Sequence, residues 1–308
     1  MARWSKRTRA LLLTSLAWTC VSADEPLPPA LPPLYETGAR SDLIGRILVP
    51  IKVNSKGPFQ FVLDTGANST VLTPRLAQLL GLEISDSKTM TLSGVTGSAS
   101  VPTVAVDEVK AGDVVLGARR LPVSDSLSPD VFGILGVDAL VDTRIRMDFV
   151  AGKLQIRKAR REGVLDGHTR IPAHCQMKLL MMVKASVGRV PVSAVIDTGS
   201  QYTLANQVLR TRLGLPERIA ASNATEVIGE TLARQRGERR RVPVFRLGGG
   251  VQTVTPTFIF GDFHVFRLWG LDDEPAIVVG MDMLGSLEAL VIDYQRCEIQ
   301  VRPRRSQQ

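Results

Sequence analysis

The segment FVLDTGANSTVL (61–72) returns later in the chain as AVIDTGSQYTL (194–204). The two Asp-Thr-Gly triplets are 133 residues apart, and the same offset relates Leu80-Gly81-Leu82 to Leu213-Gly214-Leu215. Further on, FGILGVDAL (132–140) matches IVVGMDML (277–284) at an offset of 144 residues. Coincidence is a poor explanation for two triplets that share both upstream and downstream landmarks. The chain therefore contains two copies of one unit.

The repeats define the organisation of the chain. We predict a first lobe at 46–157 and a second lobe at 171–303, joined by a charged linker at 158–170. Residues 24–45, which include DEPLPPALPPLYE, are rich in Pro and predict an extended spacer that is not a packed element. The growth of the offset from 133 to 144 predicts an insertion in the second lobe, near 230–256.

The apolar residues of each lobe come in short runs rich in Val and Ile and interrupted by Gly and Pro. Several short strands at this spacing indicate an all-β fold made of two β-barrel-like lobes. Short helices are expected at Pro74–Leu80, which Thr73 can cap, and at Gln207–Leu213 behind Asn206. One further helical turn is expected after each Gly-x-Asp, at 138–142 and at 282–287.

The amino terminus has the pattern of a secretory signal peptide. Four basic residues precede the apolar stretch ALLLTSLAW, and Val21-Ser22-Ala23 offers a cleavage site after residue 23. We therefore expect an exported protein, periplasmic or secreted, with a signal peptide at 1–23. The alternative is a membrane anchor formed by an uncleaved signal. After residue 30 no apolar run reaches the ~18–20 residues of a membrane helix, so no membrane span is expected once the signal is cleaved.

Charge and composition exclude several function classes. The chain has 38 Lys and Arg against 30 Asp and Glu, a net charge of +8. Removal of residues 1–23 takes four basic residues away and leaves +4, so nucleic-acid binding is not predicted. The three His residues are scattered, no phosphate loop is present, and neither a metal nor a cofactor is expected. The arginine-rich run at 234–241 predicts a solvated loop, with an acidic partner, an anionic surface or a processing site as alternatives. Whether Cys175 and Cys297 form a disulfide is left open.

The paired Asp residues point to acid–base chemistry. One Asp at the end of a buried strand is most simply a turn cap. Two equivalent lobes, however, pack most simply about a pseudo-two-fold axis, which would bring Asp64 and Asp197 face to face. Two carboxylates at contact distance share a proton and titrate as a coupled pair. One is then a base and the other an acid at the same pH, as activation of a water molecule requires.

The residues after each Asp fit this arrangement. A side chain at Gly66 or Gly199 would block the close approach of the two loops. Thr65 and Thr198 can form hydrogen bonds across the axis and fix the plane of the carboxylates.

These motifs resemble the aspartic peptidases of the pepsin and retropepsin clan, and in particular the bacterial single-chain, retropepsin-like members with two Asp-Thr-Gly lobes. The resemblance covers nearly all of 46–303 and implies a bilobal acid-protease fold. It implies Asp64 and Asp197 as the catalytic dyad, with Thr65 and Thr198 bracing them. It also implies that a second motif packs behind each triplet in a psi-shaped loop pair, namely Ile134, Leu135 and Gly136 in the first lobe and Val278, Val279 and Gly280 in the second.

The resemblance further implies a β-hairpin flap that closes over the substrate. The residues in this position are Leu92–Ala99, and the flap residues expected to contact substrate are Gly94, Val95, Thr96 and Gly97. Val227-Ile228-Gly229 lies at the matching place of the second lobe, so a second flap is an open alternative. An ordinary surface hairpin is the other interpretation of both segments.

The residue after each triplet differs between the lobes. Ala67 follows the first and Ser200 follows the second. Because a hydroxyl beside a carboxylate stabilises its charged form, we expect Asp64 to be the less stabilised carboxylate. This expectation predicts activity that reaches weakly acidic or near-neutral pH.

The sequence therefore predicts an exported aspartic endopeptidase that hydrolyses peptide or protein substrates as a monomer with an internal pseudo-dimer. The alternative is a catalytically silent peptide-binding protein that retains the cleft. Substrate preference is not predicted, because pocket walls come from loops that the motifs do not specify.

Overall fold

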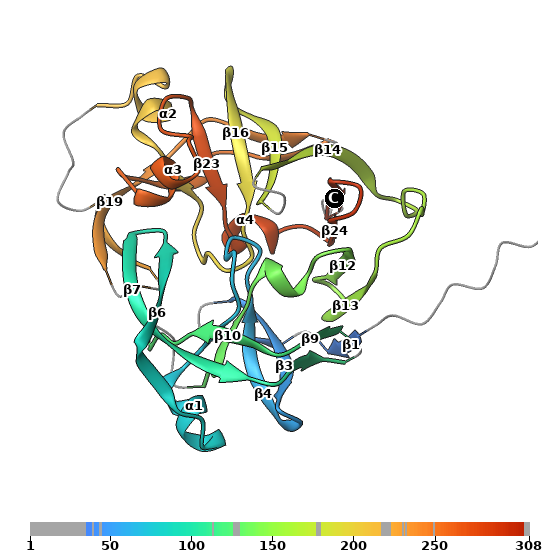
Figure 1. The fold of residues 1–308 in the computed structure, drawn as a ribbon. Coiled ribbons are helices and arrows are strands. Elements are labelled where there is room, and N and C mark those ends of the chain that lie inside the picture. Colours follow the sequence, from blue (N-terminus) through green and yellow to red (C-terminus); the bar gives the residue numbers. More distant parts are fainter. Residues whose placement is uncertain are drawn as a thin grey trace, which may run out of the picture. The chain divides into compact units, whose positions relative to one another are not determined.

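The structure is a computed structural model that describes residues 35–38, 40–42, 45–112, 114–125, 130–176, 180–216, 223–229, 231, 233–248 and 250–304. The predicted signal peptide at 1–23 and residues 24–34 of the predicted spacer lie outside the described residues. Within the described part of the chain, no helix is long and apolar enough to cross a membrane. Strands predominate over short helices, which confirms the all-β prediction (Figure 1).

The two repeats fold into the same succession of elements, except for one additional helix in the second lobe. The first lobe contains β3 (Ile47–Val53), β4 (Lys56–Leu63), β5 (Val71–Leu72), α1 (Pro74–Leu80), β6 (Ile84–Gly94), β7 (Gly97–Val106), β8 (Val109–Ala111), β9 (Val114–Leu116), β10 (Arg119–Pro122), β11 (Gly133–Leu135) and the 3₁₀ turn η1 (Val137–Ala139). The second lobe contains β15 (Leu180–Val187), β16 (Val190–Ile196), β17 (Leu204–Ala205), α2 (Gln207–Arg212), β18 (Ala224–Ile228), β19 (Arg234–Arg241), β20 (Phe245–Gly248), β21 (Val251–Thr253), β22 (Thr257–Phe260), α3 (His264–Leu268), β23 (Ala276–Val279) and α4 (Met281–Leu284).

Local sequence signals account for the two equivalent helices. Thr73 accepts a hydrogen bond from the N–H of Leu76, Pro74 opens α1, and Gly81 ends it in the left-handed conformation. Asn206 caps α2 in the same way through the N–H of Leu209. The prediction for α1 is confirmed over its whole length, and α2 ends one residue earlier than expected. The helical turns expected after the two Gly-x-Asp motifs are present as η1 and α4.

The extra length of the second lobe is distributed differently from the expectation. Residues 123–132 connect β10 to β11, whereas the longer segment 261–275 connects β22 to β23 and contains α3. The prediction of a single insertion near 230–256 is therefore wrong in part. The motifs shared by the two lobes give the total length of the insertion. They do not give its position, because the strands between these motifs have little sequence in common in the two lobes.

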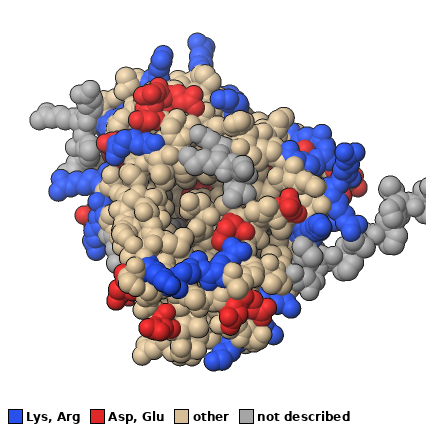
Figure 2. Space-filling view, in the orientation of Figure 1, with Lys and Arg blue, Asp and Glu red and all other residues tan. Residues whose placement is uncertain are grey.

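The arginine-rich run is also not a loop. It forms strand β19, which pairs with β18 and with β22. Within it, Arg240 contacts the buried carboxylate of Glu238, and Arg239 lies over the ring of Tyr202 at 4.7 Å from the centroid. The prediction of a solvated loop is wrong because the run pairs with a strand on each side, and Gly237 and Glu238 within it are buried. Lys, Arg, Asp and Glu are interspersed on the face shown in Figure 2.

A shared sheet joins the two lobes. Its first six strands are, in order, β1 (Tyr35–Gly38), β13 (Lys153–Lys158), β12 (Thr143–Asp148), β24 (Ala289–Asp293), β25 (Glu298–Arg302) and β14 (Thr169–Gln176), and from β14 the sheet continues into β15 of the second lobe. The middle pair of these six strands is β12 and β24, which are equivalent strands of the two lobes. The pseudo-two-fold axis that relates the lobes therefore passes between them. Tyr35–Gly38 come from the predicted spacer and form an edge strand, as do Arg40–Ser41 (β2) beside β3. The expectation that this part of the spacer is unpacked is wrong.

A buried ion network crosses the shared sheet. The side chain of Arg144, on β12 of the first lobe, is 1% exposed and lies 3.4 Å from a carboxylate oxygen of Asp293 on β24. Its guanidinium also donates to Gln300 on β25 at 3.1 Å and lies 3.7 Å from Glu162 of the linker. The first lobe, the second lobe and the linker therefore share one buried cation, whose removal would leave the buried carboxylate of Asp293 without this ion-pair partner.

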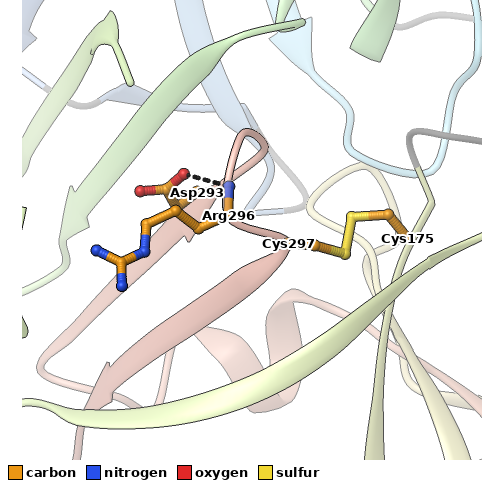
Figure 3. The surroundings of a disulfide bond; sticks show 4 residues. All are labelled: Cys175, Asp293, Arg296 and Cys297. Carbon is orange, nitrogen blue, oxygen red and sulfur yellow. Dashed lines mark hydrogen bonds between the residues drawn. A yellow bond between two sulfur atoms is a disulfide. The ribbon is translucent and has the colours of Figure 1, made fainter. Parts of the chain in front are cut away.

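The structure forms the disulfide that the sequence left open. Cys175 on β14 is bonded to Cys297, which lies in the turn before β25, with 5.7 Å between their Cα atoms (Figure 3). In the same turn the N–H of Arg296 donates to Asp293 at 3.0 Å. The disulfide thus fastens the last strand of the shared sheet beside the ion network.

We predict that Arg144→Ala lowers the free energy of unfolding by about 3–5 kcal/mol, because it leaves the buried carboxylate of Asp293 without its cationic partner. Arg146→Ala is the matched control, since Arg146 lies on the same strand but pairs with Asp148 at 37% side-chain exposure. This control should cost at most about 1 kcal/mol. Chemical denaturation of both variants measures the difference, and equal losses would contradict the role assigned to the network.

Candidate active site

The two Asp-Thr-Gly triplets begin where two buried strands end. Strand β11 runs parallel to β4, with Leu135 opposite Leu63, and β23 runs parallel to β16, with Val279 opposite Ile196. The backbone N–H groups of both Asp residues continue this pairing at 3.1 Å, Asp64 to Leu135 and Asp197 to Val279. Strands buried on both faces need continuous apolar sequence, which explains the residues before each triplet.

The second predicted motif lies directly behind each triplet loop. An added Cβ at Gly136 would lie 2.5 Å from the backbone of Ser69, and one at Gly280 would lie 2.6 Å from the backbone of Tyr202. Glycine is therefore required at both positions by close backbone approach. The structure brings the Ile134-Leu135-Gly136 and Val278-Val279-Gly280 segments against the loops that carry the carboxylates.

The two threonines exchange hydrogen bonds between the lobes. The N–H of Thr65 donates to Oγ1 of Thr198 at 3.2 Å, and the N–H of Thr198 donates to Oγ1 of Thr65 at 3.1 Å. Each hydroxyl then donates to a carbonyl of the opposite lobe, Thr65 to Ile196 at 2.9 Å and Thr198 to Leu63 at 2.7 Å. Both side chains are buried, so every polar group in this contact is satisfied away from water.

The two carboxyl groups are buried and adjacent. An added Cβ at Gly66 would lie 2.7 Å from the carboxyl carbon of Asp197, and one at Gly199 would lie 2.1 Å from that of Asp64. No side chain fits at either position without moving a carboxylate. Asp64 and Asp197 are only 5% and 4% exposed, which makes the ionisation of both costly.

The electrostatics of the pair are unequal. Burial raises the pKa of Asp197 well above its usual range, and the nearby charge of Asp64 raises it further. The N–H groups of Gly199 and Ser200 donate to Asp197 at 2.9 Å and 3.3 Å and oppose this shift. Asp64 accepts two N–H groups of its own, from Gly66 at 2.8 Å and from Ala67 at 2.9 Å. Burial therefore favours the protonated form of Asp197, and the two carboxyl groups share one proton as a coupled pair.

The role expected of Ser200 is wrong. Its hydroxyl donates to the carbonyl of Tyr202 at 2.8 Å, so it is committed to the backbone of its own turn and only its N–H reaches Asp197. Asp197, which has the hydroxyl-bearing neighbour, is the carboxyl with the raised pKa. The identity of residue 200 could not reveal which way its hydroxyl points. Burial is the main cause of the raised pKa of Asp197.

Two further residues hold the second triplet loop and were not predicted. Thr203 Oγ1 donates to Asp282 at 2.7 Å and accepts from the N–H of Gly280 at 3.2 Å. The N–H of Thr203 also donates to Asp282, at 3.0 Å. Burial raises the pKa of Asp282. The pair therefore ties the triplet loop to the glycine behind it.

The first lobe repeats this arrangement. Thr70 Oγ1 donates to Asp138 at 2.7 Å and accepts from Gly136 N–H at 3.3 Å. The sequence contained a signal for these residues: each lobe has a Thr six residues after its triplet Asp and an Asp two residues after its second-motif Gly.

The predicted flap is a β-hairpin. Strands β6 and β7 pair with Leu92 opposite Ala99 and Gly94 opposite Gly97, leaving Val95 and Thr96 at the tip. Figure 1 shows this hairpin extending from the first lobe toward β19. The matching hairpin of the second lobe, β18–β19, is also present, with Ile228 opposite Arg234.

The flap tip is docked on the second lobe. Thr96 Oγ1 donates to the carbonyl of Ala233 at 2.8 Å and accepts from Gly229 N–H at 3.1 Å. The carbonyl of Val95 accepts from the N–H of Val265 on α3 at 3.2 Å. The tip therefore bridges the entrance above the dyad.

A cavity of about 140 Å³ lies between this tip and the two carboxyl groups. Its lining includes Asp64 and Asp197, flap residues Ser93–Val95, and apolar residues of both lobes. Among the described residues, no group of three or more His, Cys, Asp and Glu side chains is arranged to hold a metal ion. The chemistry available in the cavity is therefore that of a proton-sharing carboxyl pair beneath a closed hairpin.

Comparison with known families agrees with this geometry for the first lobe. Residues 49–139 match a family model described as aspartyl protease. The match supports an aspartyl protease family. It spans Asp64, the flap and the segment that packs behind the first triplet. No curated protein matches the chain.

The raised pKa of Asp197 predicts a pH-dependent cost to stability. Its stabilising contribution is fully present below the unfolded-state value of about 3.9 and is lost as pH rises through the folded pKa. Asp197→Asn retains an oxygen for the N–H donors and does not ionise. Its stability relative to wild type should therefore increase from pH 4 to pH 7 in thermal denaturation. A difference that does not change with pH would contradict the assignment.

Docking of the flap can be tested by Thr96→Val, which keeps the shape of the side chain but removes the two hydrogen bonds of the Thr96 hydroxyl. At about 0.5–1.5 kcal/mol for each bond, amide exchange in residues 93–99 should accelerate roughly tenfold or more. Thr91→Val, at an exposed position of the same hairpin, is the matched control and should leave exchange unchanged. Exchange at the tip that is equal in both variants would show that the docking contacts do not hold the flap.

Proposed function

We propose that the chain is an exported aspartic endopeptidase that hydrolyses peptide bonds with a water molecule activated between Asp64 and Asp197. The observation that carries this proposal is the burial of two carboxyl groups side by side, one with a raised pKa, at the base of a cavity covered by a hairpin. A buried acidic pair is costly to maintain, and the two lobes hold it with reciprocal hydrogen bonds.

The mechanism follows from the unequal protonation of the pair. Asp64, as the carboxylate, takes a proton from water while the water oxygen bonds to the peptide carbonyl carbon. Asp197 gives its proton to the carbonyl oxygen, which yields a neutral tetrahedral diol. Collapse of the diol breaks the C–N bond, with a proton passing to the amine and one carboxyl protonated again at the end. The N–H donors from Gly66 and Ala67 keep the base oriented throughout.

The flap supplies the second requirement, which is exclusion of solvent. Because its tip is docked on the second lobe, a peptide must displace it to enter and is enclosed when it returns. A peptide or protein chain is the substrate that this covered groove would accept. We also propose a monomer in which the two lobes act as an internal dimer, since the shared sheet and the threonine contact already join them.

Export is proposed on the amino-terminal sequence pattern. The disulfide between Cys175 and Cys297 supports this proposal, because disulfides persist in oxidising compartments outside the cytosol.

Cleavage of a peptide library across pH tests the enzymatic proposal. Asp64→Asn should reduce kcat/KM by at least about 10²–10⁴-fold, since it removes the base. Asp107→Asn, at an exposed position outside the cavity, is the control and should cleave like wild type. A folded wild type that cleaves nothing at any pH would favour the silent peptide-binding alternative.

The pH profile adds an independent check. The raised pKa of Asp197 keeps one carboxyl protonated to a higher pH than an ordinary Asp, so we expect activity to extend into the weakly acidic or near-neutral range. A rate maximum below about pH 3 would contradict this expectation.

A further inference from the structure

The six strands shared by the two lobes have an outer face that points away from the cavity. Their inner side chains, such as Ile145, Ile156 and Val301, belong to the main hydrophobic core. That core also contains Val137, which lines the cavity. Because side chains alternate along a strand, the residues in between face outward. The outward cations are Arg144 and Arg146 on β12, Lys153 and Arg157 on β13, Arg170 on β14 and Arg302 on β25.

The linker between the lobes lies across this outer face. The N–H of Leu165 donates to the side chain of Gln300 on β25 at 3.0 Å, and the amide of Gln300 donates to the carbonyl of Gly163 at 3.4 Å. The linker therefore adds its own cations, Arg160 and Arg161, to those of the sheet. We call the outer face of these six strands together with the linker the basic face.

The net positive charge of the chain is concentrated here. The segments 142–170 and 288–304, which build the basic face, contain eleven Lys and Arg against seven Asp and Glu. This excess of four equals the whole net charge expected after removal of residues 1–23, because the rest of 24–308 has 23 residues of each sign. Figure 2 shows Lys and Arg gathered on the right-hand side of the molecule, where Figure 1 places the green linker.

Three exposed cations of the basic face form neither a hydrogen bond nor an ion pair through their side chains with any described residue. These three are Lys158, Arg160 and Arg161. Carboxylates of the same face are already occupied: Glu298 lies 3.1 Å from Arg170 and 3.5 Å from Arg296. Arg161 and Arg296 line one surface hollow together with Gln295. The unpaired cations are therefore available to an anion from outside the chain.

Exposed apolar side chains accompany these cations. Val164 of the linker is 39% exposed, and Val141 is 49% exposed. The N–H of Ala159 donates to the carbonyl of Asp142 at 2.7 Å, which places the start of the linker beside Val141. Cations with long apolar stems next to exposed apolar residues are typical of surfaces that lie against lipid headgroups.

The amino-terminal segment joins the fold at the same place. Tyr35, the first described residue, pairs with Ile156 on β13, close to Arg157 and Lys158. The predicted signal peptide precedes it by the Pro-rich residues 24–34, which would span roughly 34 Å at about 3.1 Å per residue. As long as the signal is attached, a membrane is therefore within reach of the basic face.

We propose that the basic face is a docking surface for an anionic lipid membrane, with Lys158, Arg160 and Arg161 contacting the headgroup phosphates. Docking through this face keeps the cavity on the side away from the lipid, where chains in the surrounding solution reach it. The inference goes beyond the proposed peptidase function and does not depend on the chemistry of the two carboxyl groups.

Amide exchange of the full chain on lipid vesicles tests the contact directly. Vesicles of equal parts phosphatidylglycerol and phosphatidylcholine should slow exchange several-fold in residues 158–165, and phosphatidylcholine alone should not. The predicted signal peptide can attach to either kind of vesicle, so this comparison isolates lipid charge. Salt at about 1 M, where the screening length is about 3 Å, should abolish the protection. Protection that is absent, or equal on both kinds of vesicle, would overturn the inference.

A charge-neutralising variant tests the three unpaired cations. Lys158→Gln, Arg160→Gln and Arg161→Gln combined should weaken binding to the mixed vesicles roughly tenfold or more, because each Lys or Arg near an anionic membrane strengthens binding about fivefold. Peptide cleavage in solution and the thermal midpoint should stay as in wild type, since these side chains contact no described residue.

The matched control removes the same charge elsewhere. Arg212→Gln, Arg236→Gln and Arg241→Gln combined change three exposed positions of the second lobe, outside the basic face, and should bind the vesicles like wild type. Equal weakening in both triple variants would show that only net charge matters and would overturn the assigned surface. Protection of 158–165 by soluble polyglutamate but not by the mixed vesicles would assign the face to an acidic protein and overturn the membrane proposal.

Discussion

The contact on which the structure depends is the approach of two buried carboxyl groups from opposite lobes. Such a pair repels when both groups ionise and loses hydration in either state, so the surrounding fold must hold it in place. Reciprocal hydrogen bonds between Thr65 and Thr198 satisfy the buried polar groups of the two loops. The glycines of both triplets allow the opposite carboxyl group to lie where a side chain would otherwise be. The shared sheet and the Arg144 network then keep the lobes together at a distance from the site.

The duplication explains much of this arrangement, and the departures from it explain the rest. Equivalent residues hold both triplet loops, down to the paired contacts of Thr70 with Asp138 and of Thr203 with Asp282. Burial and the nearby charge of Asp64 nevertheless raise the pKa of Asp197 well above its usual range. One proton shared between the two carboxyl groups provides one acid and one base, which is the arrangement that activation of a water molecule requires.

The sequence predicted what local chemistry and repetition determine. The short helices followed from their caps, and the facing of Asp64 and Asp197 followed from two copies of one motif. Features that depend on distant packing were not predictable: the Ser200 hydroxyl turned to Tyr202, the arginine run became strand β19, and Tyr35–Gly38 joined the shared sheet. The position of α3 was not predicted, because the repeated motifs lie on either side of it and its own sequence has no counterpart in the first lobe.

Fusion of the two lobes in one chain is what makes an unequal pocket available. In a dimer of identical chains, any residue added to one wall is added to the other, so both flanks of the scissile bond meet the same surface. Here the α3 segment lengthens only the second lobe, and it builds an apolar wall and a docking point for the opposite flap from the same five-residue helix. A change at α3 can therefore alter this wall of the cavity without altering the carboxyl pair, whose supports lie in the segments that the two lobes still share.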